Sequence, residues 1–116
     1  MNIIEQIEYM KSIDPNISLC PHSYQLARHC SEVFSENLHN LFKVMFSQSD
    51  KNNDLHIIEL YFDNDSQYLD ILFDELTTAS IFYRKKTKFN HLEEKSIFLK
   101  KVSIDEIYDC VTGLIY

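Results

Sequence analysis

The sequence predicts an α+β fold with two N-terminal helices, a small and mostly antiparallel sheet, and a C-terminal helix. Three observations lead to this prediction. Apolar residues recur at helical spacing near both ends of the chain, runs dense in β-forming residues occupy the centre, and turn-forming clusters separate those runs. At 116 residues the chain has the length of one domain, residues 1–116. An all-helical bundle is the alternative fold, because the three elements with the clearest patterns are helices.

A first helix is predicted over residues 2–13. Asn2 and Glu5 have the spacing of a capping box, in which the first side chain accepts a hydrogen bond from the backbone N–H three residues later. Ile3 and Ile7 then lie on one helical face. An Asp-Pro pair follows. The residue before a proline disfavours helical backbone, so the helix is expected to end there.

A second, long helix is predicted over residues 21–48. Its apolar residues repeat every three or four positions, which is the spacing of one helical face. They are Leu26, Cys30, Val33, Phe34, Leu38, Leu41, Phe42 and Met45. The polar residues 47–54 then predict a solvated loop.

The centre of the chain is expected to form the sheet. Residues 55–62 are dense in β-forming side chains and bounded by turn residues, which predicts a buried strand. Residues 66–77 fit either a helix or the return strand of a hairpin. Further strands are predicted at 80–88 and 95–102, with a turn at 90–94 between them.

The last helix has the clearest start signal in the chain. Ser103 and Glu106 form a second capping box, in which the serine hydroxyl accepts from the backbone N–H of Glu106. Ile104, Ile107 and Val111 follow at helical spacing. A helix that packs one apolar face on the sheet is therefore expected from residue 103 onwards.

The composition excludes several classes of catalytic site. The chain has one glycine, Gly113. Phosphate-binding loops, dinucleotide fingerprints and nucleophile elbows need glycines at fixed spacing, because glycine alone turns the backbone freely and allows close approach of a ligand. No catalytic motif is present, so we expect the protein not to be an enzyme and to need no cofactor.

Cys20, His22, His29 and Cys30 form the most metal-like cluster in the sequence. Zinc requires four ligands that converge tetrahedrally. Adjacent residues on a helix diverge by about 100°, so the last two ligands would point apart. A buried cysteine that packs as a small apolar side chain explains Cys30 better, and no metal is expected.

Acidic charge is concentrated in the middle of the chain. The formal net charge is −7, and residues 50–79 hold one basic and eight acidic side chains, a net charge of −7. Nucleic-acid and anionic-membrane binders need a positive surface, so neither partner is expected. The balance favours a basic protein as partner.

The acidic segment also contains aromatic residues, a combination typical of a surface that binds a basic protein. Aromatic side chains supply contact area, while carboxylates steer the encounter and pair with Lys or Arg. The residues expected to bind the partner are Glu59, Tyr61, Asp63, Asp65, Tyr68, Asp70, Asp74 and Glu75. The basic run at 84–88 is a competing site, although protection of an edge strand by lysines explains it equally well.

These features predict an inhibitor or immunity-type protein that neutralises a basic toxin domain, such as a nuclease, by covering its active-site cleft. One alternative is a secretion-type chaperone or regulatory adaptor that dimerises through the long helix. Another is a viral or phage protein that intercepts a host protein. The N-terminal residues lack the basic and apolar regions of a signal peptide, and no apolar run reaches membrane-spanning length, so a cytoplasmic location is expected.

Overall fold

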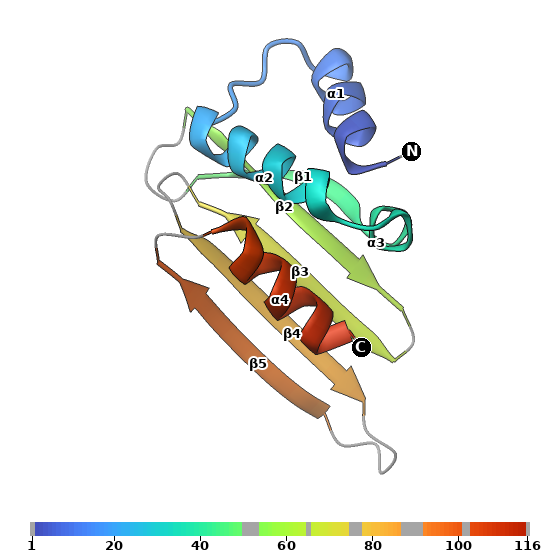
Figure 1. The fold of residues 1–116 in the computed structure, drawn as a ribbon. Helices are drawn as coiled ribbons and strands as arrows, with labels where there is room; N and C mark the ends of the chain where they lie inside the picture. The colour runs from blue at the N-terminus through green and yellow to red at the C-terminus, as the bar shows by residue number, and fades with distance from the viewer. Residues whose placement is uncertain are drawn as a thin grey trace.

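Helices cover one side of a five-stranded antiparallel sheet in the computed structural model (Figure 1). The structure describes residues 2–49, 54–64, 66–74, 78–86, 92–100 and 103–115. The helices among them are α1 (Ile3–Ile13), α2 (Pro21–Val33), α3 (Glu36–Leu41) and α4 (Ile104–Ile115). The strands are β1 (Lys43–Gln48), β2 (His56–Asp63), β3 (Gln67–Phe73), β4 (Ala79–Lys86) and β5 (Leu92–Leu99). The α+β prediction is confirmed, and the all-helical alternative is wrong.

Both predicted helix caps are present. The Asn2 side chain accepts a hydrogen bond from the backbone N–H of Glu5 at 2.8 Å. The Ser103 hydroxyl accepts from the backbone N–H of Glu106 at 3.2 Å. Each bond satisfies one of the N–H groups that a helix start leaves without an internal partner, so α1 and α4 begin where the sequence indicated.

The prediction of one long helix over residues 21–48 is wrong after Val33. The backbone is extended at Phe34, and Ser35 caps the short helix α3 by accepting from the N–H of Leu38 at 3.3 Å. The segment after α3 forms strand β1, which pairs antiparallel with β2. Phe34 and Leu38 stay buried across the break, so the apolar spacing resembles that of one continuous helix.

Residues 66–77 contain a strand, the second of the two predicted possibilities. The side chain of Asn64 accepts from the backbone N–H groups of Ser66 and Gln67 at 3.0 and 2.8 Å. This Asx-type turn reverses the chain and starts β3, which pairs antiparallel with β2. The segment is therefore the return strand of a hairpin.

The sheet is a simple meander in the order β1-β2-β3-β4-β5. Each strand pairs with the next one along the chain, as expected when short turns join antiparallel strands. Strand β5 begins at Leu92, so the predicted turn at 90–94 is wrong for its last three residues. Residues 90 and 91 lie outside the described part of the chain.

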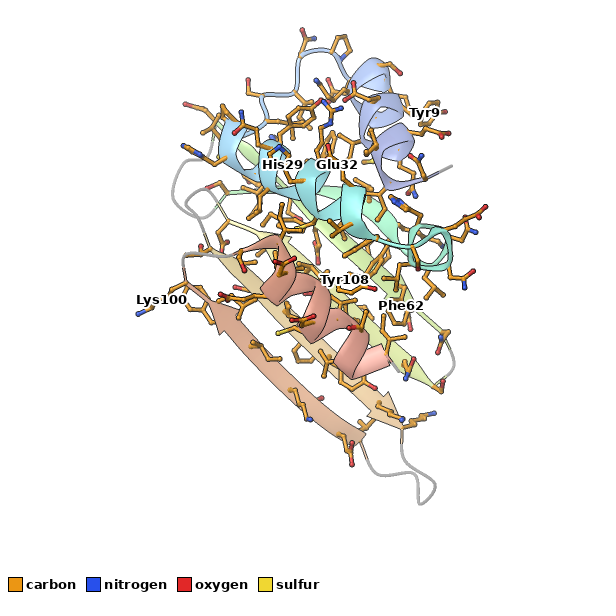
Figure 2. All side chains as sticks on the ribbon, in the orientation of Figure 1. Tyr9, His29, Glu32, Phe62, Lys100 and Tyr108 are labelled. Carbon is orange, nitrogen blue, oxygen red and sulfur yellow. The ribbon has the colours of Figure 1, made fainter. Side chains whose placement is uncertain are left out.

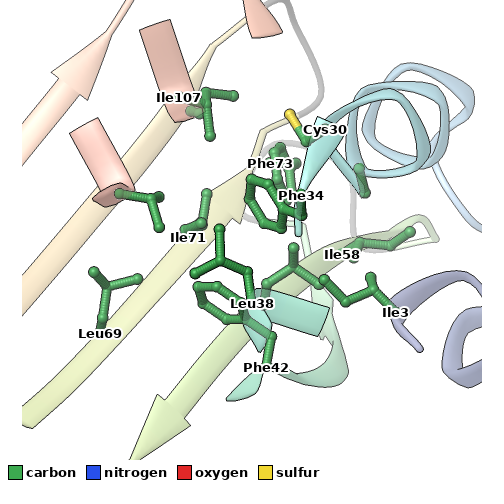
Figure 3. Close-up of a cluster of buried hydrophobic side chains, with 14 of the residues drawn as sticks. Ile3, Cys30, Phe34, Leu38, Phe42, Ile58, Leu69, Ile71, Phe73 and Ile107 are labelled. Atoms are coloured by element: carbon green, nitrogen blue, oxygen red, sulfur yellow. The ribbon is translucent and has the colours of Figure 1, made fainter. Parts of the chain in front are cut away.

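The hydrophobic core lies between the helices and the sheet (Figure 3). Alternate residues of the central strands, such as Leu69, Ile71 and Phe73, meet Cys30 and Ile107 from the helices. Because side chains of a strand alternate between its two faces, the residues between them point to the opposite side of the sheet. Figure 2 shows that α2 directs His29 and Glu32 away from this core. The core thus fixes which strand residues reach the other face.

Candidate protein-binding face

One face of the sheet has no helix over it among the described residues (Figure 1). We call this surface the open face, and it is the side opposite the core. The strand register places on it Lys43, Met45, Ser47, Ile57, Glu59, Tyr61, Asp63, Tyr68, Asp70, Leu72, Ser80, Phe82, Arg84, Lys86, Leu92, Glu94, Ser96 and Phe98. The face combines acidic, aromatic and aliphatic side chains.

The register gathers five of the eight predicted binding residues on this face. Tyr61 lies opposite Asp70, and Asp63 lies opposite Tyr68. Glu59 is two residues from Tyr61 on the same strand and therefore shares its face. Opposed residues of neighbouring strands have Cβ atoms about 4.5–5.5 Å apart, so the group forms one continuous surface.

Tyr68 occupies a fixed position in this group. Its hydroxyl donates a hydrogen bond to Oδ2 of Asp70 at 2.9 Å. Its ring meets Phe82 edge to face with centroids 6.1 Å apart, and the guanidinium of Arg84 lies 5.5 Å from its centroid. Burial and the neighbouring carboxylate of Asp70 raise the pKa of Tyr68 to about 12. The phenol is therefore a neutral donor at physiological pH.

Glu59 and Asp70 are half-buried carboxylates on adjacent strands. Burial raises the pKa of Glu59, the negative charge of Asp70 raises it further, and a 3.0 Å hydrogen bond from the Ser47 hydroxyl partly opposes the rise. Burial also raises the pKa of Asp70, against the effect of the Tyr68 bond. No described Lys or Arg is among the causes of either pKa shift, although Lys43 and Arg84 share the open face.

Apolar residues that the sequence reasoning missed extend the open face towards β5. Leu72, Phe82 and Phe98 line a shallow depression of about 210 Å³ together with Asp70. Met45, at the opposite side of the face, is 42% exposed. Strict alternation along β3 and β4 could have revealed Leu72 and Phe82, but only once the 66–77 segment was assigned as a strand.

The remaining predicted residues have different positions. Asp74 lies at the end of β3, where its Oδ2 accepts from the hydroxyls of Thr78 and Ser80 at 3.3 and 3.4 Å. Its backbone N–H also donates to the carbonyl of Thr78 at 3.1 Å, so the residue closes the β3–β4 turn. Asp65 and Glu75 lie outside the described residues.

The competing basic run borders the same face. Arg84 and Lys86 alternate with Lys85, so they share the open face with Tyr68. A depression of about 250 Å³ lies between Arg84, Lys86 and the acidic Asp63. The charge at this end is mixed, whereas the surface around Glu59 and Asp70 is acidic.

The surroundings of Cys30 and Cys110 disfavour their thiolate forms. Burial raises the pKa of Cys30 to about 12, and burial followed by the charges of Glu106 and Asp109 raises the pKa of Cys110. A nucleophilic or metal-binding cysteine needs its thiolate, which a raised pKa disfavours. Cys20 is also buried. Within the described parts of the chain, no three His, Cys, Asp or Glu side chains are placed to share a metal ion.

No protein-family model matches this sequence, and no match to a curated protein or a solved structure was found. None of the helices in the described ranges has the length and apolar character needed to cross a membrane. The geometry of the open face therefore carries the functional argument.

Proposed function

We propose that the protein binds a basic protein through its open face and inhibits it. The observation that supports this proposal is the pair Glu59 and Asp70, which are half-buried, lie close to aromatic rings and have pKa values raised mainly by burial. A Lys or Arg side chain of the partner would neutralise both carboxylates and stack on Tyr61 or Tyr68.

The proposed contact has a centre and a rim of different energetic weight. Glu59 and Asp70 are already partly desolvated, so a cation that reaches them forms a charge-assisted hydrogen bond shielded from water. Removing one partner of such a pair costs about 2–5 kcal/mol of binding free energy. Asp63 is exposed at the end of β2 and belongs to the rim, where a charge mainly speeds association.

A toxin domain such as a nuclease is the partner class that best fits this chemistry. Enzymes that bind nucleic-acid phosphates present Lys and Arg in the cleft that holds the backbone. An acidic face with aromatic anchors can occupy that cleft and exclude the substrate. The net charge of −7 accelerates the encounter with such a cationic surface. On this proposal the protein acts as an immunity-type inhibitor.

The secretion-chaperone alternative requires dimerisation through one long helix. That helix is divided into α2, α3 and β1. Interception of a host protein by a viral or phage protein would use the same open face, and only the identity of the partner separates it from the inhibitor proposal.

The decisive experiment compares charge-neutral variants after the partner is isolated. The protein is cross-linked in its native cells, the partner is identified and purified, and dissociation constants are measured by calorimetry. We expect Asp70→Asn and Glu59→Gln each to weaken binding by about 2–5 kcal/mol. The matched controls are Asp109→Asn on α4 and Glu32→Gln on α2, which remove exposed charges on the helical side. Equal affinity for all four variants would reject the open face as the binding site.

A further inference from the structure

Strand β5 forms an open edge of the sheet. It pairs with β4 on one side and is last in the strand order. No described residue lies along its other side (Figure 1). Two of its large apolar side chains, Leu92 and Phe98, are 57% and 56% exposed. An edge of this length with exposed apolar residues is a template for pairing with another strand.

The hydrogen-bond pattern shows which residues of β5 offer their backbone groups outwards. The N–H of Lys86 donates to the carbonyl of Ser66 at 2.9 Å, so the backbone of Lys86 points towards β3. Successive residues of an antiparallel strand point their backbone groups to alternate sides, so Lys85 points to Glu93 on β5. The outward-pointing residues of β5 are therefore Leu92, Glu94, Ser96 and Phe98.

At the opposite edge of the sheet, the chain itself bonds the start of β1. The side-chain amide of Gln6 in α1 donates from Nε2 to the carbonyl of Phe42 at 3.0 Å. Its Oε1 accepts from the backbone N–H of Val44 at 3.1 Å. One amide thus supplies the bonds that a neighbouring strand would make at the start of β1. No such side chain reaches β5 from the described residues.

We propose that β5 pairs antiparallel with β5 of a second copy, about a two-fold axis that passes through Lys95. This register pairs all four outward-pointing residues, since Leu92 then meets Phe98 of the second copy and Glu94 meets its Ser96. Paired outward residues exchange two bonds each, so the contact forms roughly eight backbone hydrogen bonds. The same register covers both exposed apolar side chains of each copy.

The charges of β5 form both attractive and repulsive pairs with a second copy in this register. The two Lys95 side chains lie opposite each other at the axis, on the helical side of the sheet. Each is a diagonal neighbour of Glu93 in the other copy, at about 7–8 Å, within reach of long side chains. Glu93, Glu94 and Lys95 are all exposed in the single chain. The contact therefore sets two Glu–Lys pairs against the Lys–Lys repulsion and against the repulsion between the two Glu94 side chains, which are diagonal neighbours on the open face.

The first test measures association of the full chain. Sedimentation equilibrium of the wild-type protein should show a dimer at micromolar concentration. Ser96→Pro removes an outward N–H without affecting a bond to β4, and prolines are accepted at sheet edges. We expect this variant to weaken the dimer by about tenfold or more, since each contact then loses two backbone bonds. Ser96→Ala keeps the N–H and should dimerise like the wild type.

The second test reads the register directly. Lys95→Cys places the thiols of the two copies next to each other at the two-fold axis, so mild oxidation should give a disulfide-linked dimer. Glu93→Cys lies opposite Ile97 of the second copy and should not cross-link. Far-UV circular dichroism confirms that each variant is folded.

Three results would overturn the proposal. The first is a wild-type chain that stays monomeric at all concentrations. The second is a dimer that Ser96→Pro leaves unchanged or that Lys95→Cys does not cross-link. The third is a monomeric chain whose β5 amides become protected from hydrogen exchange when a different protein is added, since the edge would then accept a foreign strand. None of these results concerns Asp70, so the inhibitor proposal is tested independently of the dimer.

Discussion

Tyr68 and Asp70 stand two residues apart on β3, and the phenol of the first donates a 2.9 Å hydrogen bond to the carboxylate of the second. Side chains at positions i and i+2 of a strand share a face, which makes this bond possible. It holds the carboxylate of Asp70 in one position on the open face. The bond uses Oδ2, one of the two carboxylate oxygens of Asp70.

Tyr68→Phe should raise the pKa of Asp70 further. The hydroxyl bond lowers that pKa, so its loss leaves the effect of burial unopposed. The variant should lose about 0.5–1.5 kcal/mol of stability, the usual net contribution of one hydrogen bond. Carboxyl titration by NMR gives the pKa, and Tyr61→Phe is the matched control. An Asp70 pKa that shifts equally in both variants would show that the bond is absent in solution.

Glu59→Gln should increase stability relative to the wild type as the pH rises. The folded pKa of Glu59 is raised above its unfolded value, so the native state binds more protons than the unfolded state between the two values. The contribution of Glu59 to the free energy of unfolding is therefore complete below the unfolded pKa. It is lost as the pH rises through the folded pKa. Urea unfolding at pH 3.5 and pH 7 should show the variant gaining on the wild type at the higher pH, with Glu32→Gln as control. A constant difference between the two pH values would contradict the shift.

Asp74→Lys should destabilise the fold, in contrast to the charge reversal Asp63→Lys. Asp74 accepts two hydroxyl bonds that close the β3–β4 turn, whereas Asp63 is exposed at a strand end. We expect a loss of about 1–3 kcal/mol for the first and less than about 0.5 kcal/mol for the second. Urea denaturation of both variants decides the matter. If both variants lost equally little free energy of unfolding, Asp74 would be a solvated charge without a structural role in the turn.

Ile107→Ala should cost more than Ser103→Ala. Ile107 lies on the buried face of α4, and truncation of such a side chain costs about 2–5 kcal/mol. Loss of the Ser103 cap should cost about 0.5–2 kcal/mol. If chemical denaturation shows that Ile107→Ala loses less free energy of unfolding than Ser103→Ala, α4 does not pack on the sheet as described.

Cys30 should resist thiol reagents until the protein unfolds. Its thiol is buried, and the pKa of about 12 leaves almost no thiolate at pH 8. Labelling with a chromogenic disulfide, followed by peptide mapping, should show Cys110 modified before Cys30. Rapid labelling of Cys30 in the native state would require an opening of the core between α2 and the sheet.

Local signals located most of the elements but not the break after α2. The caps at Asn2 and Ser103 are short-range patterns, and both helix starts were predicted correctly. The division at Ser35 depends on pairing of β1 with β2, a contact that spacing along the chain does not encode. Apolar periodicity continues across it, since Phe34, directly after α2, and Leu38 in α3 both reach the core.

The candidate site followed from composition only in part. The acidic and aromatic residues of β2 and β3 could be selected from the sequence, but their juxtaposition depends on the register that sets Tyr61 opposite Asp70. Phe82 and Phe98 were missed because they belong to later strands and join the face only through pairing. Asp74 was selected for its charge, although its hydrogen bonds make it a turn residue.

The amide of Gln6 also limits how large an assembly can become. A sheet with two open edges can add copies at both ends and grow into a fibre. Gln6 occupies the carbonyl of Phe42 and the N–H of Val44 at the start of the β1 edge, so another strand can pair there only by displacing it. One side chain of the first helix therefore opposes growth beyond a pair, and Gln6→Ala should leave these two backbone groups open to a further copy.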